Sequence, residues 1–193
     1  MLQRLVPALA AAVLLAASGG AAAQKLSFPY EGYLCCNLLN DGGWVNDINY
    51  RSDRKQLLAA GTPVKATGFG RYRVQVQIDG KKLAIGNDYS RAVGMDDFAR
   101  RYILANDPRP AMEGFAPKVR EAITAMKVMR GMTREQVLMS VGYPPAHYTP
   151  DLEAPLWRYW ADSGSEFQVF WGNDGKVDQV FGPPAVRERV VLE

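Results

Sequence analysis

Apolar and polar residues alternate most clearly over residues 71–78. Every second residue from Tyr72 to Ile78 is apolar, whereas the residues between them are arginine or glutamine. A period of two places these sets on opposite faces of a β-strand. Asp79-Gly80 then suits a tight turn, and residues 81–85 return as a second strand. The pattern therefore predicts a β-hairpin.

The rest of residues 24–93 also predicts short strands separated by turns. Residues 30–39 and 44–50 flank the turn sequence Asn40-Asp41-Gly42-Gly43. No helical period occurs in this stretch. We therefore expect residues 24–93 to form a β domain.

The apolar spacing becomes helical after residue 94. Phe98 and Tyr102 lie four residues apart behind two aspartates, and the sequence Asn106-Asp107-Pro108-Arg109-Pro110 is expected to end this helix. A second helix is expected to begin at Pro117, with one apolar stripe made of Val119, Ala122, Ile123 and Met126. We expect residues 94–116 to be a helical connector.

A third helix is predicted by its end signals. Thr133 and Gln136 have the spacing of a capping box, and Gly142 followed by Pro144-Pro145 ends the helix. Residues 156–161, 166–171 and 176–181 then predict three strands joined by two hairpin-length turns. Residues 183–193 fit either a short strand or a disordered end. The fold class predicted for the whole chain is α+β.

Aromatic residues of the last three strands are the best candidates for a binding surface. The period of two separates Trp157 and Tyr159 from Arg158 and Trp160, and it places Phe170 opposite Phe167. Helices on one side of the sheet should bury one set and expose the other. The candidate interaction residues are therefore Trp157, Arg158, Tyr159, Trp160 and Phe170, with packing by the N-terminal domain as the alternative use of the open face.

The start of the chain has the pattern of a secretory signal peptide. Arg4 precedes an apolar run over residues 5–17, and small residues continue to Ala23. The alternative is a retained anchor, but a spanning helix needs about 20 apolar residues, more than this run provides. We expect residues 1–23 to be cleaved, giving a periplasmic protein with no integral membrane segment.

Composition narrows the classes of function. The 23 Lys and Arg nearly balance the 20 Asp and Glu, which does not suggest a nucleic-acid partner. His147 is the sole histidine, so a histidine-rich metal site is excluded and a serine–histidine triad would depend on one loop residue. We expect no enzymatic activity, no catalytic residue, no metal and no cofactor.

The two cysteines, Cys35 and Cys36, are adjacent. Their Cα atoms should lie about 3.8 Å apart across a trans peptide, which is below the usual range for a disulfide. Two unbonded thiols, a vicinal disulfide and an intermolecular disulfide all remain open. A thiol-dependent enzyme using either cysteine is a further hypothesis, without a supporting local signature.

Two segments resemble known families. The run LLAAGTPVKA at residues 57–66 resembles the start of a strand in bacterial SH3-like barrels, and this resemblance covers roughly residues 30–90. Residues 129–137 (MRGMTREQV), followed by VGYP, WRY, FQVF and GKV, resemble the SmpA/OmlA family over roughly residues 117–182. That family includes the E subunit of the outer-membrane β-barrel assembly machinery.

The resemblances imply a two-part exported protein. An SH3-like half implies binding of cell-wall peptide or a protein partner, and the SmpA/OmlA family implies a non-catalytic module of two helices and three strands that holds envelope proteins together. Such family members begin with a lipidated cysteine, whereas Cys35 lies far beyond the apolar run, so we predict no lipid anchor.

The expected organisation is a signal peptide (1–23), an SH3-like β domain (24–93), a helical connector (94–116) and an SmpA/OmlA-like module (117–193). The expected function is protein interaction or assembly in the envelope, peripheral to the outer membrane, with the outer-membrane assembly machinery among the partners. The alternative is a cell-wall-binding protein that regulates or inhibits a wall enzyme.

Overall fold

The predicted hairpin forms in the computed structural model, which describes residues 25–193. Its strands are β6 (Arg73–Ile78) and β7 (Lys81–Gly86), and Asp79 and Gly80 turn between them with φ angles of 49° and 74°. The apolar residues of β6 are buried on one face, as the alternation predicts. Tyr72 differs, because it lies in the preceding turn and is exposed.

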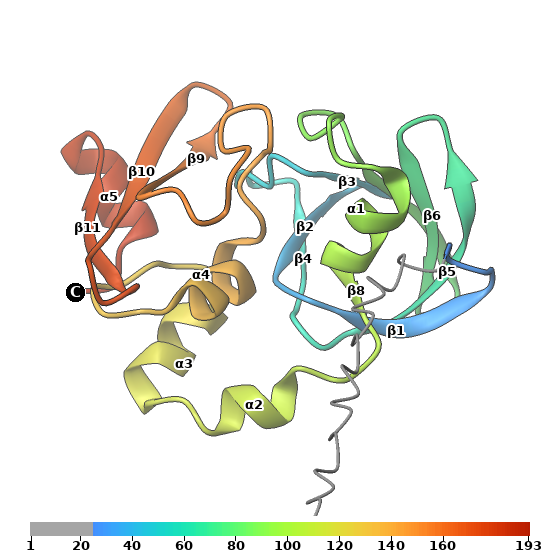
Figure 1. The fold of residues 1–193 in the computed structure, drawn as a ribbon, viewed down its shortest axis with the longest axis horizontal. Coiled ribbons are helices and arrows are strands. Elements are labelled where there is room, and N and C mark those ends of the chain that lie inside the picture. The colour runs from blue at the N-terminus through green and yellow to red at the C-terminus, as the bar shows by residue number, and fades with distance from the viewer. Residues whose placement is uncertain (1–24) are drawn as a thin grey trace, which may run out of the picture.

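Eight strands of the N-terminal lobe form one curled sheet in the order β4-β2-β3-β7-β6-β5-β1-β8, with the shape of a half-barrel (Figure 1). Neighbouring strands are antiparallel, except that β3 and β7 are parallel. The remaining strands of this sheet are β1 (Tyr30–Leu34), β2 (Leu38–Asp41), β3 (Trp44–Asn46), β4 (Gln56–Leu58), β5 (Pro63–Gly70) and β8 (Ile103–Leu104).

Two of the predicted strands are shorter than expected. The strand predicted over residues 30–39 divides into β1 and β2, because residues 35–37 leave the sheet: the Cys35 N–H donates to the Tyr102 carbonyl and the Asn37 N–H to that of Met139. The strand predicted over residues 44–50 ends at Asn46. Asn49 then has a φ of 48°, a left-handed conformation that does not continue a strand.

Helix α1 (Met95–Tyr102) packs against the half-barrel and completes its core. Phe98 and Tyr102 are buried, so their predicted spacing marks the packed face. The helix ends before the prolines that were expected to stop it, because Ile103 is extended and pairs with Leu34 as part of β8.

The C-terminal lobe packs three helices against one face of a three-stranded sheet. The sheet order is β11-β10-β9, with both pairs antiparallel, and helices α3, α4 and α5 contribute to the core beneath it. Its elements are α3 (Pro117–Thr124), α4 (Arg134–Val141), β9 (Leu156–Asp162), β10 (Ser165–Trp171), β11 (Val177–Phe181) and α5 (Pro184–Val190). The three strands and the α+β class are confirmed.

The end signals of α4 are also confirmed. The Thr133 hydroxyl accepts from the Gln136 N–H at 3.3 Å, and the Gln136 side chain accepts from the Thr133 N–H at 2.9 Å. Gly142 follows the helix with a φ of 85°, a conformation that glycine adopts without steric cost. These contacts fix both ends of a short helix.

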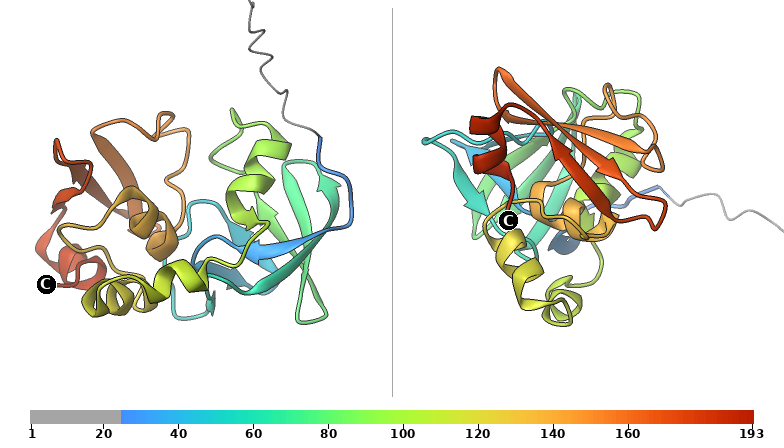
Figure 2. Two further views of the ribbon diagram at one scale, coloured as in Figure 1. Left: turned by 60° about the horizontal axis from the view of Figure 1, so that its bottom comes forward. Right: turned by 90° about the vertical axis from the view of Figure 1, so that its left-hand side faces the viewer.

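Two helices were not expected. Helix α2 (Arg109–Glu113) lies in the segment that passes between the lobes, where the sequence predicted only the end of a helix (Figures 1 and 2). The tail forms α5, and Val186 and Val190 bury it against the sheet. The Val128 N–H donates to the Val190 carbonyl, which ties α5 to the segment after α3.

The expected connector divides between the two cores. Helix α1 and Ile103 belong to the core of the half-barrel, whereas Met112 and Phe115 pack against the core of the C-terminal lobe. Residues before about 105 therefore pack in the core of the N-terminal lobe, and residues after about 111 pack in the core of the C-terminal lobe. Of the helices within residues 25–193, none has the length and apolar character needed to cross a membrane.

Buried asparagines of the N-terminal lobe cap the end of α4. The carbonyls of Ser140 and Val141 would accept from the residues four positions on, but these are prolines 144 and 145, which have no N–H. The Asn37 side chain instead donates to the Ser140 carbonyl at 3.2 Å, and that of Asn49 to the Val141 carbonyl at 2.9 Å. The prolines after α4 therefore leave two backbone carbonyls of the helix free to accept hydrogen bonds from the N-terminal lobe, and these bonds join the lobes.

Both asparagines also have their remaining hydrogen-bonding groups paired. Asn37 donates to the Ile123 carbonyl at 2.6 Å and accepts from the Ala60 N–H at 3.0 Å. Asn49 donates to the Asn37 carbonyl and accepts from the Leu39 N–H, each at 2.9 Å. A polar network that is fully paired and buried specifies one arrangement of the two lobes.

Candidate functional site

The outer sheet face, which we define as the side of β9, β10 and β11 away from the helices, carries a mixture of aromatic and polar side chains. The register pairs Trp160 with Glu166, and it places Gln168 between Arg158 and Phe181 and Phe170 between Leu156 and Gln179. Phe170 is 37% exposed and Phe181 is 60% exposed. Aromatic and arginine side chains of this kind are enriched at protein interfaces.

Two of the predicted interaction residues belong to the opposite face. Trp157 and Tyr159 are buried in the core beneath the sheet, where the Trp157 Nε1 donates to the Leu152 carbonyl at 3.1 Å. The assignment of these two residues to a surface is therefore wrong. The helices bury this alternate set and leave Arg158, Trp160 and Phe170 on the outer sheet face.

Arg158 is held in place on the outer sheet face by an ion pair. Its guanidinium donates to both Glu166 carboxylate oxygens, at 2.9 and 2.6 Å, and the Gln168 amide donates to the same carboxylate. The hydrogen bond from Arg158 lowers the pKa of Glu166, so this carboxylate stays charged in mildly acidic solution. The pair gives the face a fixed polar centre between aromatic residues.

An aromatic extension continues from the outer sheet face toward the N-terminal lobe. The Tyr148 ring lies 4.5 Å from the Trp160 ring, and the His147 ring lies 4.7 Å from that of Tyr148. The His147 N–H donates to the Tyr89 carbonyl, which belongs to the N-terminal lobe. Sequence reasoning missed Tyr89 and Tyr148, because no periodic pattern predicts which loop residues meet a sheet. Phe181 was also missed, although it ends β11 and alternates with buried Val180 within a predicted strand.

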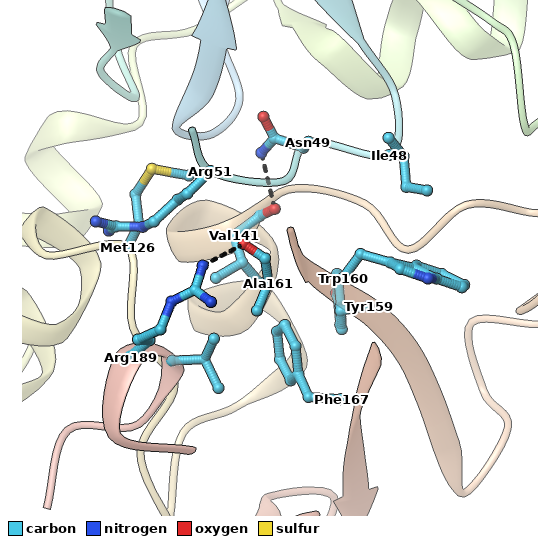
Figure 3. Close-up of a pocket in the computed structure, with 11 residues that line it drawn as sticks. Ile48, Asn49, Arg51, Met126, Val141, Tyr159, Trp160, Ala161, Phe167 and Arg189 are labelled. Atoms are coloured by element: carbon cyan, nitrogen blue, oxygen red, sulfur yellow. Dashed lines mark hydrogen bonds between the residues drawn. The ribbon is translucent and has the colours of Figure 1, made fainter. Parts of the chain in front are cut away.

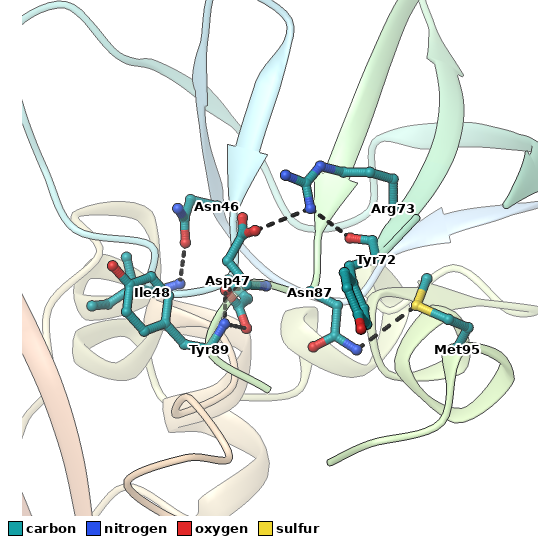
Figure 4. Close-up of polar contacts among 9 residues, drawn as sticks. Asn46, Asp47, Ile48, Tyr72, Arg73, Asn87, Tyr89 and Met95 are labelled. Carbon is teal, nitrogen blue, oxygen red and sulfur yellow. Dashed lines mark hydrogen bonds and ion pairs between the residues drawn. The ribbon is translucent and has the colours of Figure 1, made fainter. Parts of the chain in front are cut away.

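Buried Asp47 positions the loop that carries Tyr89 (Figure 4). One carboxylate oxygen accepts from the N–H groups of Asp88 and Tyr89 at 3.2 and 3.1 Å, and the other accepts from Tyr89 at 3.1 Å. Asp88 in turn pairs with Arg73 at 3.0 Å. These contacts hold the exposed Tyr89 side chain at the edge of a depression of about 670 Å³ that is also lined by His147.

The contribution of Asp47 to the stability of the protein is expected to fall as the pH rises from about 4 to about 6. Burial raises the pKa of Asp47 from 3.8 to about 6, despite hydrogen bonds that oppose this shift. The folded state therefore binds a proton that the unfolded state has lost, and deprotonation costs up to about 3 kcal/mol. Asp47→Asn should remove this component when urea unfolding is measured across the range.

Exposed Asp53 provides a matched control for that measurement. Asp53→Asn should keep the wild-type dependence between pH 4 and pH 6, because its carboxylate is not buried. An unchanged dependence in Asp47→Asn would contradict the assignment. Asp162 contributes mainly below this range, because its hydrogen bond with Arg189 lowers its pKa to about 2.

Cys35 and Cys36 are joined by a vicinal disulfide, one of the alternatives that the sequence left open. Both residues are buried within the core of the half-barrel. A nucleophilic cysteine needs an accessible thiolate. The bonded, buried sulfurs therefore do not favour the hypothesis of a thiol-dependent enzyme.

The described residues show little that suits a metal site or a catalytic histidine. Within residues 25–193, no group of three or more histidine, cysteine, aspartate or glutamate side chains is placed to hold a metal ion. His147 is exposed and contacts Tyr148. The signal-peptide prediction concerns residues 1–23, which lie outside the described residues.

Comparison with known proteins gives no relative. No protein-family model, curated protein or solved structure matches the chain. The resemblances to SH3-like barrels and to the SmpA/OmlA family therefore stay predictions. The outer sheet face and the aromatic extension are the features of the fold that suit binding of a partner.

Proposed function

We propose that this chain is a non-catalytic interaction module of the cell envelope and that the outer sheet face binds a partner protein. The observation that carries the proposal is the pair of exposed rings, Phe170 and Phe181, on the outer sheet face. Arg158 and its fixed carboxylate partner add directional hydrogen bonding at the centre of this surface. Anchoring aromatic residues around a polar group are typical of interface hot spots.

The family assignments form part of the same proposal. A half-barrel in the N-terminal lobe supports an SH3-like domain, and two helices followed by three antiparallel strands support an SmpA/OmlA-like module. In that family the module joins envelope proteins, which agrees with an open aromatic sheet face. The outer-membrane assembly machinery is the first partner to test.

The periplasmic location is proposed on two grounds. The first is the signal-peptide pattern of residues 1–23. The second is the disulfide between Cys35 and Cys36, because disulfides persist in oxidising compartments such as the periplasm. In this proposal the chain reaches the outer membrane through its partner.

Removing both exposed rings should release the protein from envelope complexes. We expect wild-type protein to migrate in a high-mass species on native gels of detergent-solubilised envelope, and a Phe170→Thr, Phe181→Thr double variant to migrate alone. The fold should survive, because neither ring is buried. Phe69→Thr is the control, since Phe69 is 38% exposed but lies on the N-terminal lobe. A double variant that stays in the complex would sink the proposal.

Cell-wall binding by the N-terminal lobe, with regulation of a wall enzyme by the C-terminal lobe, is the second candidate. An open groove of about 1020 Å³ beside β1 and β5 favours it, with Tyr33 and the ion pair of Glu31 and Lys65 in its lining. This candidate predicts that the protein sediments with purified cell-wall sacculi and that Tyr33→Ala weakens the association. Sedimentation independent of Tyr33 would exclude the groove.

A further inference from the structure

An open pocket lies where the two lobes meet, with about 390 Å³ of empty space that includes its open mouth (Figure 3). Most of its lining is apolar and includes Met126, Phe167 and Val190 from the C-terminal lobe. Two arginines, Arg51 from the N-terminal lobe and Arg189 from α5, extend toward the same side of it. We call this site the lobe pocket.

The two arginines leave one positive charge without a partner. Arg189 donates to the Asp162 carboxylate at 2.7 Å and to the Ala161 carbonyl at 3.0 Å. Arg51 donates to the neutral Ala125 carbonyl and has no acidic partner within residues 25–193. Burial, together with the charge of Arg189, lowers the pKa of Arg51. An anion placed between the two guanidinium groups would relieve their repulsion.

The free donors suit a small planar anion. Arg51 uses only one of its terminal nitrogens for Ala125, so its remaining N–H groups are available for a carboxylate oxygen. Hydrogen bonds between a guanidinium and a carboxylate are among the strongest in proteins. The anion would therefore bind beside an apolar wall, with Arg51 as its main ligand.

The size of the lobe pocket limits what else the anion carries. The enclosed part of the pocket is only about 20 Å³, room for about one water-sized group such as a methyl, so the rest of a ligand would lie in the open mouth. A long acyl chain does not fit this volume. The apolar lining beside the arginines selects a short hydrocarbon group.

We propose that the lobe pocket binds a carboxylate carried on a short apolar group, with the carboxylate between Arg51 and Arg189. Both a free branched-chain acid and the C-terminus of a peptide ending in a small apolar residue have this chemistry. Because residues of both lobes line the site, its ligand bridges them. Trp160 borders both this pocket and the outer sheet face, but Phe170 and Phe181 do not line the pocket, and binding there does not depend on a protein partner.

Calorimetric titration of the full chain with 3-methylbutanoate at low salt tests the proposal. We expect saturable binding, weakened about tenfold by Arg51→Gln, which removes one charge-assisted hydrogen-bonding group. Arg54→Gln is the control, since Arg54 is a nearby exposed arginine outside the lobe pocket and its loss should leave the affinity within about twofold. The neutral 3-methylbutanamide should not bind measurably.

A second titration distinguishes a peptide C-terminus from a free acid as the ligand. N-acetyl-alanyl-valine with a free C-terminus is compared with its C-terminal amide and with the free acid. Tighter binding of the peptide acid identifies a chain terminus as the ligand, and tighter binding of 3-methylbutanoate identifies a small acid. Absence of saturable binding by both acids, equal binding of acid and amide, or wild-type affinity in Arg51→Gln would each overturn the proposal.

Discussion

Replacing Trp157 by alanine is expected to lower the free energy of unfolding by about 4 kcal/mol. Trp157 is completely buried, and its ring lies 4.6 Å from that of Trp171. The variant loses this packing and leaves a cavity, and the Leu152 carbonyl loses its indole donor. Urea unfolding followed by circular dichroism measures the change without relying on tryptophan fluorescence.

Trp160→Ala is the matched control for Trp157→Ala. The two tryptophans belong to the same strand, but Trp160 is partly exposed and points to the outer sheet face. Its loss should cost about 1 kcal/mol, because only its contact with the Tyr148 ring and part of its surface are involved. A larger loss in Trp160→Ala than in Trp157→Ala would reverse our assignment of the two faces.

Replacing Asn37 by alanine is expected to cost about 3 kcal/mol of stability. The Ile123 carbonyl keeps the Met126 N–H as a donor, but the Ser140 carbonyl and the Ala60 N–H lose their partners in a buried position. Each unpaired buried group costs about 1 to 3 kcal/mol. Differential scanning calorimetry and urea unfolding measure the loss.

The control for Asn37 is Asn173, which is exposed in the turn between β10 and β11. Asn173→Ala should change the stability by less than about 0.5 kcal/mol. If Asn37→Ala has an equally small effect, the buried asparagines do not hold the lobes together. The capping of α4 by the N-terminal lobe would then be incidental.

The sequence predicted those structural elements that are determined by neighbouring residues. Asp79-Gly80 marked the hairpin, and Thr133 with Gln136 marked the start of α4, because turn and cap geometry depend on nearby residues. The division of the strand predicted over residues 30–39 was not predictable in this way. Its cause is a set of hydrogen bonds to Tyr102 and Met139, far along the chain.

The exposed face of the C-terminal sheet also could not be predicted from local sequence. The period of two separated Trp157 from Trp160, but both alternate sets contain aromatic residues, so the pattern did not decide which set is buried. Helices α3, α4 and α5 make that choice, and α5 itself was not predicted. The lobe pocket needs Arg51 and Arg189, which are far apart in the sequence, and only the folded structure brings them together.

Photo-crosslinking in the native envelope tests the central claim most directly. A benzophenone amino acid replaces Phe170 on the outer sheet face or Phe69 on the N-terminal lobe, two phenylalanines of nearly equal exposure at 37% and 38%. We predict a discrete adduct with one envelope protein from position 170 and none from position 69. Adducts from position 69 alone, or equal adducts from both positions, would contradict the assignment of partner binding to the outer sheet face.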